Sequence, residues 1–428
     1  MCKKLTCSAY VAAFIFAGAV HAQAPGITME MIRTALPLEG APRAVHGPYD
    51  VSFEPAWESP RHVVYRPEDL RAFPAEDSLP VLIWGNGGCA LNSNGYRGFL
   101  TTVASQGFIA IATAVIDGEE SRRATTEDLR AAIDWVIAEN TRADSPLAGK
   151  INVDEIAAMG TSCGGYRAID LGSDPRVATI GVFNSGVQDA DREDRSPTAP
   201  TPEDLAALHG PVLLIDGHER DFMMDEAQAT FAALEHVPVF YGSRHNAGHS
   251  ATVFHPGGGE FANVAAAWLR FQFKGDEDAG QMFVGDSCEL CEKNTWDTAA
   301  KALSYEAIRS ITTERVVMRH LAGSAAGDAS VIRRDYAGDA IVVFGGEASV
   351  GIDAVAAVFE DLYARTPLDL DYSTLTFEDE VGYIVWTLGD LTGSDTFIVR
   401  DARIAVQTGI VFQSGEQRPG ISRRAFPE

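Results

Sequence analysis

Short hydrophobic runs alternate with segments of helical periodicity between about residues 61 and 274. Several runs are apolar throughout, as expected of parallel strands that are covered on both faces. The segment from Thr125 to Glu139 opens with a threonine and acidic residues before its apolar positions, which predicts a capped helix. The expected strands are His62–Tyr65, Pro80–Trp84, Phe108–Ala114, Glu155–Met159, Ala178–Phe183, Pro211–Asp216 and Val237–Tyr241. This alternation predicts a doubly wound α/β sheet.

The pattern changes after Lys274, where a polar and irregular segment leads into a different arrangement. The expected helices are Tyr305–Leu321, Ala329–Tyr336 and Ile352–Ala364, and the expected strands are Ala340–Phe344, Asp369–Phe377, Glu380–Leu388, Asp395–Arg400 and Ile404–Phe412. Helices followed by antiparallel strands are typical of an α+β domain. We therefore expect a signal peptide at residues 1–22, an α/β domain at 23–298 and a smaller α+β domain at 299–428.

The first 22 residues have the layout of a secretory signal peptide. Lys3 and Lys4 precede an apolar run from Ala9 to Val20, and Val20-His21-Ala22 offers a suitable cleavage point. The run is too short to span a bilayer comfortably, and no later segment is long and apolar enough to be a membrane helix. The sequence therefore predicts a secreted or periplasmic protein that is not embedded in a membrane.

The chain is strongly acidic. Its 428 residues are 46% hydrophobic and 22% charged, which is ordinary for a globular protein with a real core and long enough for two domains. The formal net charge is −26, and it becomes −28 when the two lysines of the signal peptide are removed. Such a surface argues against nucleic acids and anionic membranes as partners.

A glycine-rich turn, GTSCGG, spans residues 160–165 between an expected strand and an expected helix. This is the context of a nucleophile elbow, in which glycines leave room for a sharp turn and the serine oxygen projects above the sheet. Turns of this composition are also common without catalysis. A serine hydroxyl is a poor nucleophile alone, so Ser162 would need a base, an orienting acid and amide donors for an oxyanion.

The donor loop is expected after the strand Pro80–Trp84. There the sequence GNGGC, residues 85–89, leaves backbone amides free of bulky side chains. We expect the amide of Gly88, together with the amide of Cys163 just after the nucleophile, to form the oxyanion hole.

The acid and the base are expected in loops after two later strands. Asp221 lies a few residues beyond one strand, and His249 follows the last strand of the domain. Ser162, Asp221 and His249 then occur in the chain order of this class of triad. Taken singly, each residue has a structural explanation, such as a helix cap for Asp221. The rival candidates are Asp216, Glu219 and Asp225 for the acid and His245 for the base.

Four cysteines remain once the signal peptide is removed. An oxidising compartment favours a small disulfide between Cys288 and Cys291. Half of a zinc site is the alternative, but no second pair with ligand spacing accompanies it. The sequence leaves open whether Cys89 and Cys163 are bonded or free, and Cys163 has no base of its own that would make it the nucleophile.

Together the motifs resemble secreted α/β-hydrolases, most closely the esterase branch related to chlorophyllase, cutinase-like and polyester hydrolases. The resemblance covers about residues 55–297 and rests on VLIWGNGGC, GFIAIA, IDWV, MGTSCGGYRAID, DPRV, GHSATVF, WLRFQFKGD and CELC. It implies Ser162, Asp221 and His249 as the triad, with Gly88 and Cys163 as the oxyanion hole. The GNGG loop differs from the His-Gly form common in lipases, so the resemblance does not specify the substrate.

Residues from about 303 to 415 are similar to the SnoaL-like, nuclear-transport-factor-2-like fold. The similarity rests on VVMRHLAGSAAGDASVIRRDYAGDAIVVFGG, GIDAVAAVFEDLY and GYIVWTLGDLTGSDTFIVRDARIAVQTGIVFQ. It implies a cone of helices on a curved sheet, which in some relatives holds a lyase or isomerase site and in others binds ligands or dimerises. The candidate lining residues are His320, Tyr336, Trp386 and Asp395, with a place in the core as the alternative. We expect this domain to form a homodimer or capture a ligand.

The sequence thus predicts a serine hydrolase that cleaves a small-molecule or polymeric carboxylic ester through an acyl-enzyme on Ser162. His249 would act as the base and Asp221 would orient it, and this chemistry needs no metal and no organic cofactor. A peptidase, an acyltransferase and a non-enzymatic binding protein with a degenerate triad remain as alternatives.

Overall fold

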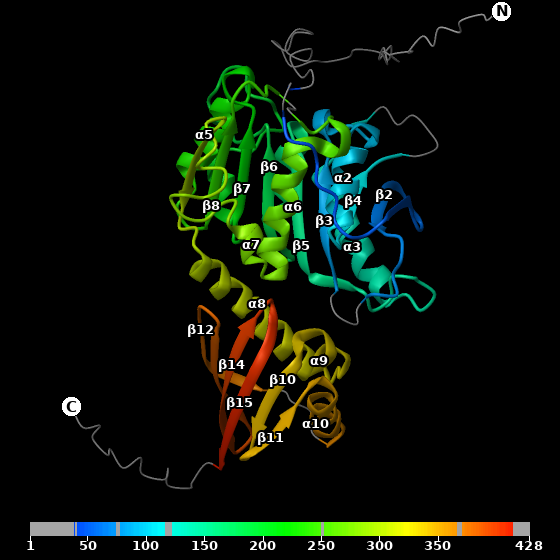
Figure 1. Ribbon diagram of the computed structural model, residues 1–428, viewed down its shortest axis with the longest axis vertical. Coiled ribbons are helices and arrows are strands. Elements are labelled where there is room, and N and C mark those ends of the chain that lie inside the picture. Colours follow the sequence, from blue (N-terminus) through cyan, green and yellow to red (C-terminus); the bar gives the residue numbers. More distant parts are fainter. Residues whose placement is uncertain are drawn as a thin grey trace, which may run out of the picture.

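The computed structural model describes residue 38 and residues 41–73, 78–115, 122–249, 252–365 and 370–413. These residues form two units, a larger one built from the first part of the chain and a smaller one below it (Figure 1). The expected signal peptide, residues 1–22, lies outside the described residues. Within the described ranges, no helix has the length and apolar character that crossing a bilayer requires.

The larger unit is organised around a nine-stranded sheet in the order β1-β2-β4-β3-β5-β6-β7-β8-β9. The central strands, from β4 to β8 in this order, are all parallel, whereas β1, β2 and β9 join the edges through antiparallel pairs. The strands are β1 (Val51–Ala56), β2 (Ser59–Pro67), β3 (Leu79–Gly85), β4 (Ile109–Thr113), β5 (Ile151–Thr161), β6 (Val177–Phe183), β7 (Val212–Asp216), β8 (Val239–Arg244) and β9 (Trp296–Lys301). The expected α/β sheet is confirmed, with β1 and β9 as additions.

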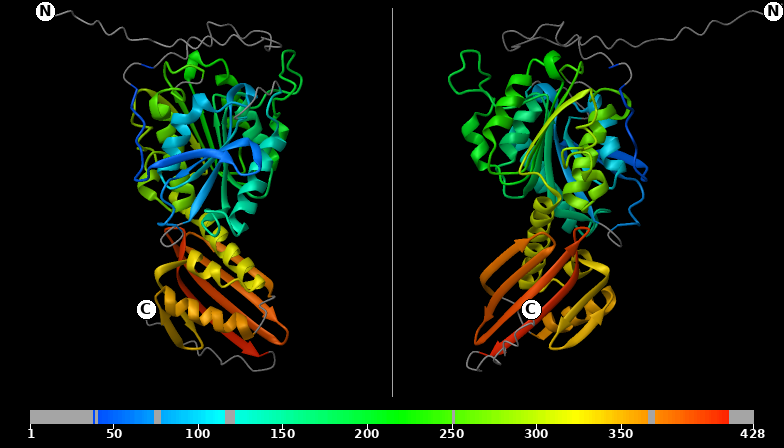
Figure 2. Two further views of the ribbon diagram at one scale, coloured as in Figure 1. Left: turned by 90° about the vertical axis from the view of Figure 1, so that its right-hand side faces the viewer. Right: turned by 60° about the vertical axis from the view of Figure 1, so that its left-hand side comes forward.

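Helices cover both faces of this sheet (Figure 2). One face packs against α2 (Arg97–Ser105) and α6 (Gly259–Lys274), and the other against α3 (Thr126–Thr141), α4 (Cys163–Leu171) and α5 (Met224–Ala233). Strand β3 shows why its sequence is apolar throughout, because its alternate side chains enter different cores. Leu82 and Trp84 lie in the first core, and Val81 and Ile83 lie in the second.

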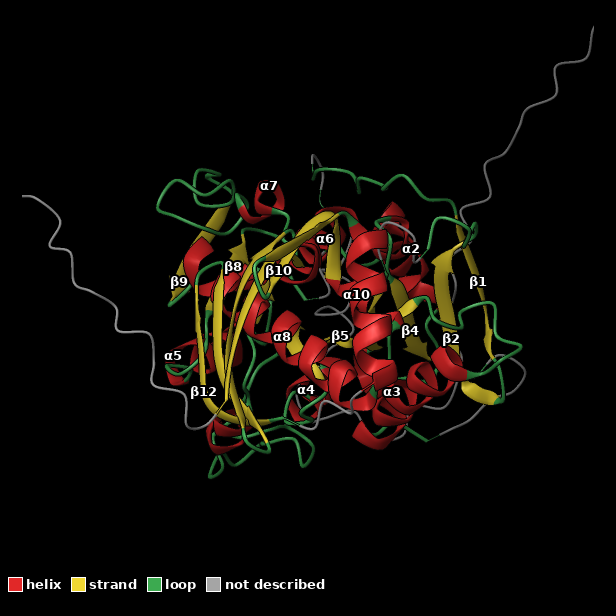
Figure 3. Ribbon diagram, turned by 90° about the horizontal axis from the view of Figure 1, so that it is seen from below, coloured by secondary structure: helices red, strands yellow, loops and turns green. Residues whose placement is uncertain are grey.

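The smaller unit is a six-stranded sheet in the order β11-β10-β15-β14-β13-β12, in which only β10 and β15 form a parallel pair. Helices α8 and α10 lie on one side of this curved sheet (Figure 3). The elements are α8 (Tyr305–Ala326), α9 (Ser330–Asp335), β10 (Tyr336–Phe344), β11 (Glu347–Val350), α10 (Ile352–Arg365), β12 (Asp371–Glu378), β13 (Val381–Leu388), β14 (Leu391–Arg400) and β15 (Arg403–Gln413). A second sheet with helices on one face agrees with the α+β expectation.

The connection between the units is more ordered than its polar sequence indicates. It contains the short helix α7 (Glu277–Gly280), a disulfide between Cys288 and Cys291, and strand β9. The disulfide decides between the two alternatives for this cysteine pair, because its sulfurs are bonded to each other. Strand β9 pairs with β8 as far as Lys301, so the expected boundary between residues 298 and 299 falls inside a strand of the larger unit.

Candidate active site

Ser162 occupies the sharp turn between β5 and α4, with φ 54° and ψ −126°. A positive φ is costly for a residue other than glycine, so neighbouring contacts must hold it. The Ser162 amide donates to the carbonyl oxygen of Phe183 at 2.9 Å. A Cβ on Gly160 would collide with the backbone of Gly164, and a Cβ on Gly164 would collide with the backbone of Gly85. The glycines therefore allow β3, β5 and α4 to meet closely around a half-buried serine.

Asp221 and His249 form a buried pair on the loops that follow β7 and β8. Nδ1 of His249 lies 2.8 Å from Oδ1 of Asp221, and the two side chains are 11% and 0% exposed. Asp221 also accepts hydrogen bonds from Nδ2 of Asn184 at 2.7 Å and from the amide of Met223 at 3.0 Å. Burial raises the pKa of Asp221, but the hydrogen bonds from His249, Asn184 and Met223 outweigh it and hold this pKa below its ordinary value. An ionised Asp221 keeps the proton of His249 on Nδ1, which leaves Nε2 able to accept one.

Met223 links this pair to the serine. Its sulfur lies 3.9 Å from Oγ of Ser162, and its backbone amide donates to Asp221. The ring of Phe222 packs against the His249 imidazole, with centroids 4.0 Å apart. Within the described part of the chain, no hydrogen bond joins Ser162 directly to His249. Proton transfer between them therefore requires side-chain movement from this arrangement, as is common in ligand-free sites.

The loop after β3 contributes backbone amides beside the elbow. It forms the turn Gly87–Cys89, in which Gly88 has φ 65° and would have open space around an added Cβ. The amide of Gly87 donates to Oη of Tyr96 at 2.9 Å. The amides of Gly88 and Cys163 have no acceptor among the described residues. Two free amides on adjoining turns are what an oxyanion hole requires.

A disulfide between Cys89 and Cys163 joins this loop to the elbow, with Cα atoms 5.2 Å apart. The bond answers the question that the sequence left open about these two cysteines. It also removes the thiolate of Cys163 from consideration as a nucleophile while the bond is intact. The expected oxyanion residues Gly88 and Cys163 thus lie on two segments that are covalently tied together.

The rival acids and base have other surroundings. Asp216 accepts a hydrogen bond from Oη of Tyr241 at 2.7 Å, and burial raises the pKa of Asp216 to about 6. Nε2 of His245 lies 3.0 Å from the carboxylate of Asp297. Two further rivals are exposed, namely Glu219 and Asp225. The structure therefore pairs Asp221 with His249, places Asp216 and His245 in other contacts, and leaves Glu219 and Asp225 exposed.

Several residues of this site escaped the sequence analysis. Asn184, which binds Asp221, follows β6 and has φ 50°. A polar residue directly after a parallel strand is the signal that would have revealed it, because the carboxyl ends of such strands share one edge of the sheet. Phe222, Met223 and Tyr96 have no comparable local signal, since they act through contacts between distant loops.

The four candidates in the smaller unit belong to its buried core. Oη of Tyr336 lies 3.3 Å from Nε2 of His320 and is hydrogen-bonded to Gln407. Nε2 of Gln407 donates to Asp395 at 3.0 Å, and Nε1 of Trp386 donates to the same carboxylate. These hydrogen bonds satisfy Tyr336, Trp386 and Asp395, whereas Nδ1 of His320 is buried without a partner among the described residues. The mutual contacts fit the core alternative that the sequence left open.

The large, mainly parallel sheet, with Ser162 on a sharp turn after β5, fits the fold of α/β-hydrolases. Residues 95–287 match the family model described as "PETase: PET hydrolase-like". The similarity to PET hydrolases covers less than half of the chain, and it includes Ser162, Asp221 and His249 but not the loop at residues 85–89. The comparison with curated proteins finds no match.

Proposed function

We propose that this protein is a serine hydrolase of carboxylic esters. The observation that carries the proposal is the half-buried Ser162 on a strained turn, connected through Met223 to the buried pair Asp221–His249. The similarity of residues 95–287 to the PET hydrolase-like family supports an ester, small or polymeric, as the substrate.

The proposed mechanism gives each group one task. His249 accepts the proton of Ser162 through Nε2 while Oγ attacks the ester carbonyl, and Asp221 stabilises the imidazolium that forms. The amides of Gly88 and Cys163 donate to the oxyanion, a contribution of about 3 kcal/mol for each donor. His249 then protonates the departing alcohol, and a water molecule activated by the same imidazole releases the acid from Ser162.

Aromatic side chains next to these groups suit an apolar part of the substrate. Phe222 packs on His249 and is half-buried, and Phe254 is 47% exposed and lies against Tyr96, with ring centroids 5.1 Å apart. Tyr96 also holds the donor loop through Gly87. We expect short acyl chains to be preferred, because the sequence shows no long hydrophobic insertion that would act as a lid.

Hydrolysis of p-nitrophenyl esters of increasing chain length by the secreted chain tests the proposal. The wild type is expected to turn over the short esters fastest, and Ser162→Ala to lower kcat by about 10⁴-fold or more. Ser173→Ala is the matched control, because this serine is exposed at the end of α4 and should leave kcat unchanged.

Two outcomes would contradict different parts of the account. Unchanged kcat in a folded Ser162→Ala variant would remove the assigned nucleophile. Equal or faster turnover of long-chain esters would refute only the expected preference for short chains.

A further inference from the structure

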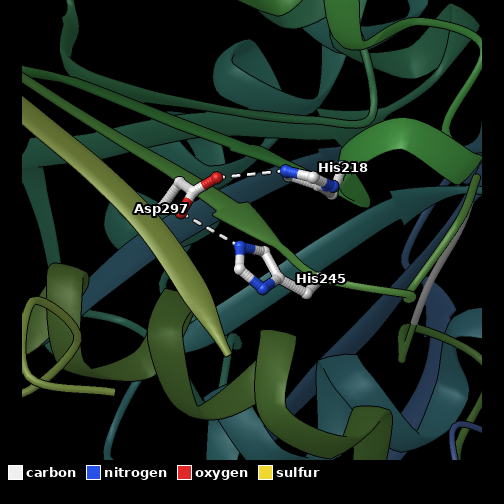
Figure 4. A group of neighbouring side chains, drawn as sticks. All are labelled: His218, His245 and Asp297. Carbon is white, nitrogen blue, oxygen red and sulfur yellow. Dashed lines mark hydrogen bonds and ion pairs between the residues drawn. The ribbon is translucent and has the colours of Figure 1, made fainter. Parts of the chain in front are cut away.

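Two histidines and an aspartate converge at the edge of the larger sheet, apart from the triad (Figure 4). His218 follows β7 in the turn His218–Arg220, His245 follows β8, and Asp297 lies on β9. Nε2 of His218 and Nε2 of His245 each lie 3.0 Å from a different oxygen of the Asp297 carboxylate. We propose that these three side chains bind one divalent transition-metal ion of the zinc class.

The spacing of the donor atoms suits such an ion. Two ligands bound at 2.0–2.2 Å to a tetrahedral ion lie about 3.3–3.6 Å from each other. All the donor atoms of the cluster lie within 4.8 Å of one another, and each imidazole nitrogen is 3.0 Å from a carboxylate oxygen, which brackets this spacing. The side chains of His218, His245 and Asp297 are 26%, 32% and 62% exposed, which leaves the cluster open to an ion from solvent.

A simple ion pair explains the cluster less completely. Nε2 of His245 is buried and lies 3.0 Å from Asp297, but the geometry of this contact is not that of a hydrogen bond. Proximity alone therefore does not make this contact a well-formed ion pair. His218 also has φ 62°, a costly backbone conformation that places its imidazole opposite the one of His245, with ring centroids 4.5 Å apart.

The types of ligand decide which ions fit. Imidazole nitrogens suit Zn²⁺, Ni²⁺ and Cu²⁺, whereas Ca²⁺ and Mg²⁺ prefer carboxylate, carbonyl and water oxygens. With two imidazoles and one carboxylate, the cluster favours Zn²⁺ over Ca²⁺, and water would complete the coordination.

The place of the cluster in the chain gives the ion a role. His218 lies three residues before Asp221, and His245 lies four residues before His249. An ion held between them and Asp297 would tie the loops of the acid and the base to β9. The ion would therefore act as a structural clamp and take no part in breaking the ester bond.

Titration of the full secreted chain with ZnCl₂ by calorimetry, after EDTA treatment at pH 7.5, tests the proposal. The wild type is expected to bind one Zn²⁺ and to gain thermal stability. His245→Ala and Asp297→Asn are each expected to bind it at least about 100-fold more weakly. His209→Ala removes an exposed imidazole outside the cluster and should bind as the wild type does.

Two further measurements keep the test decisive. CaCl₂ and MgCl₂ should not bind to the cluster at the concentrations that saturate it with zinc. Co²⁺ added to the wild type should give visible absorption typical of nitrogen and oxygen ligands, a result that does not depend on how the variants fold. The proposal would be overturned if the wild type does not bind zinc, if His245→Ala binds zinc as tightly as the wild type, or if the wild type binds Ca²⁺ as tightly as zinc.

Discussion

The two backbone amides assigned to the oxyanion hole sit at or next to a covalent cross-link. Gly88 precedes Cys89, and Cys163, which carries the second amide, is the other partner in the disulfide. Oxyanion stabilisation depends on donors that are already in place when charge develops on the substrate. We therefore expect this disulfide to position the donors as well as to stabilise the fold.

Replacing both cysteines with alanine separates these two effects. Cys89→Ala with Cys163→Ala should lower kcat on a short ester by about 10- to 100-fold with little change in KM. The free energy of unfolding should also fall by about 2–4 kcal/mol, because the bond closes a long loop. Steady-state kinetics and urea denaturation measure the two quantities.

The second disulfide provides the matched control. Cys288→Ala with Cys291→Ala removes a bond between residues three apart in the connection to β9, away from the elbow. This variant should keep kcat. A Cys89/Cys163 variant that loses stability but keeps full kcat would show that the bond near Ser162 has only a structural role.

Among the single residues of the candidate site, the sequence predicted those that lie in a recognisable local pattern and missed those that do not. Ser162 could be proposed because glycines surround it at the end of an apolar run, and His249 because it follows the last strand that the sequence predicts for this domain. The Cys89–Cys163 bond could not be found, because the sequence separation is 74 residues and a pairing depends on the fold. Met223 has no polar signature and is identified only by its contacts.

At the scale of single elements, helix α8 carries an unusual buried histidine. His320 is 2% exposed and packs against Tyr336 and Phe359, with ring centroids 5.2 Å and 5.5 Å apart. Burial lowers the pKa of His320 to about 4, with Asp335 opposing this shift and Arg319 and Arg334 adding to it. The folded smaller unit therefore holds His320 in its neutral form at neutral pH.

This burial predicts a pH dependence of stability. The pKa of His320 is lower in the folded state than its ordinary 6.5, so its contribution is complete above pH 6.5 and is lost as the pH falls to about 4. The free energy of unfolding should fall by about 3 kcal/mol over this range through this group. Urea denaturation at a series of pH values measures it.

The variant His320→Gln isolates the contribution, because other groups titrate in both proteins. The difference in unfolding free energy between wild type and variant should change by about the same 3 kcal/mol between pH 6.5 and pH 4. If the unfolding free energies of the two proteins change by the same amount between pH 6.5 and pH 4, His320 is not held in a neutral, buried state.

Elements with strong periodicity were predictable and short polar strands were not. β3 is apolar throughout, β7 is apolar up to its last residue, Asp216, and both were expected; α10 begins at Ile352 as its pattern indicates. The sequence of β9, WDTAAK, contains little hydrophobic signal, and its strand conformation depends on pairing with β8. Tertiary contacts rather than local sequence preference determine the conformation of such a segment.

At the scale of the whole molecule, buried charges join the two units. Arg319 on α8 pairs with Asp335 at 2.7 Å within its own unit and reaches Glu155 of the larger unit at 3.5 Å. Arg315, also on α8, donates to the carbonyl oxygen of Gln272 at 2.7 Å. The sequence predicted two units but not this junction, because the Arg319–Glu155 contact brings together residues 164 positions apart and depends on how the two units pack.

The central claim is that Ser162 acts as a nucleophile, and covalent labelling tests it most directly. The purified protein is treated with a fluorophosphonate, and the modified peptide is located by mass spectrometry. We predict one adduct per chain, on Ser162, absent from Ser162→Ala and formed far more slowly in His249→Ala because the base is missing. A wild type that stays unlabelled, or one labelled on another residue, would contradict the account.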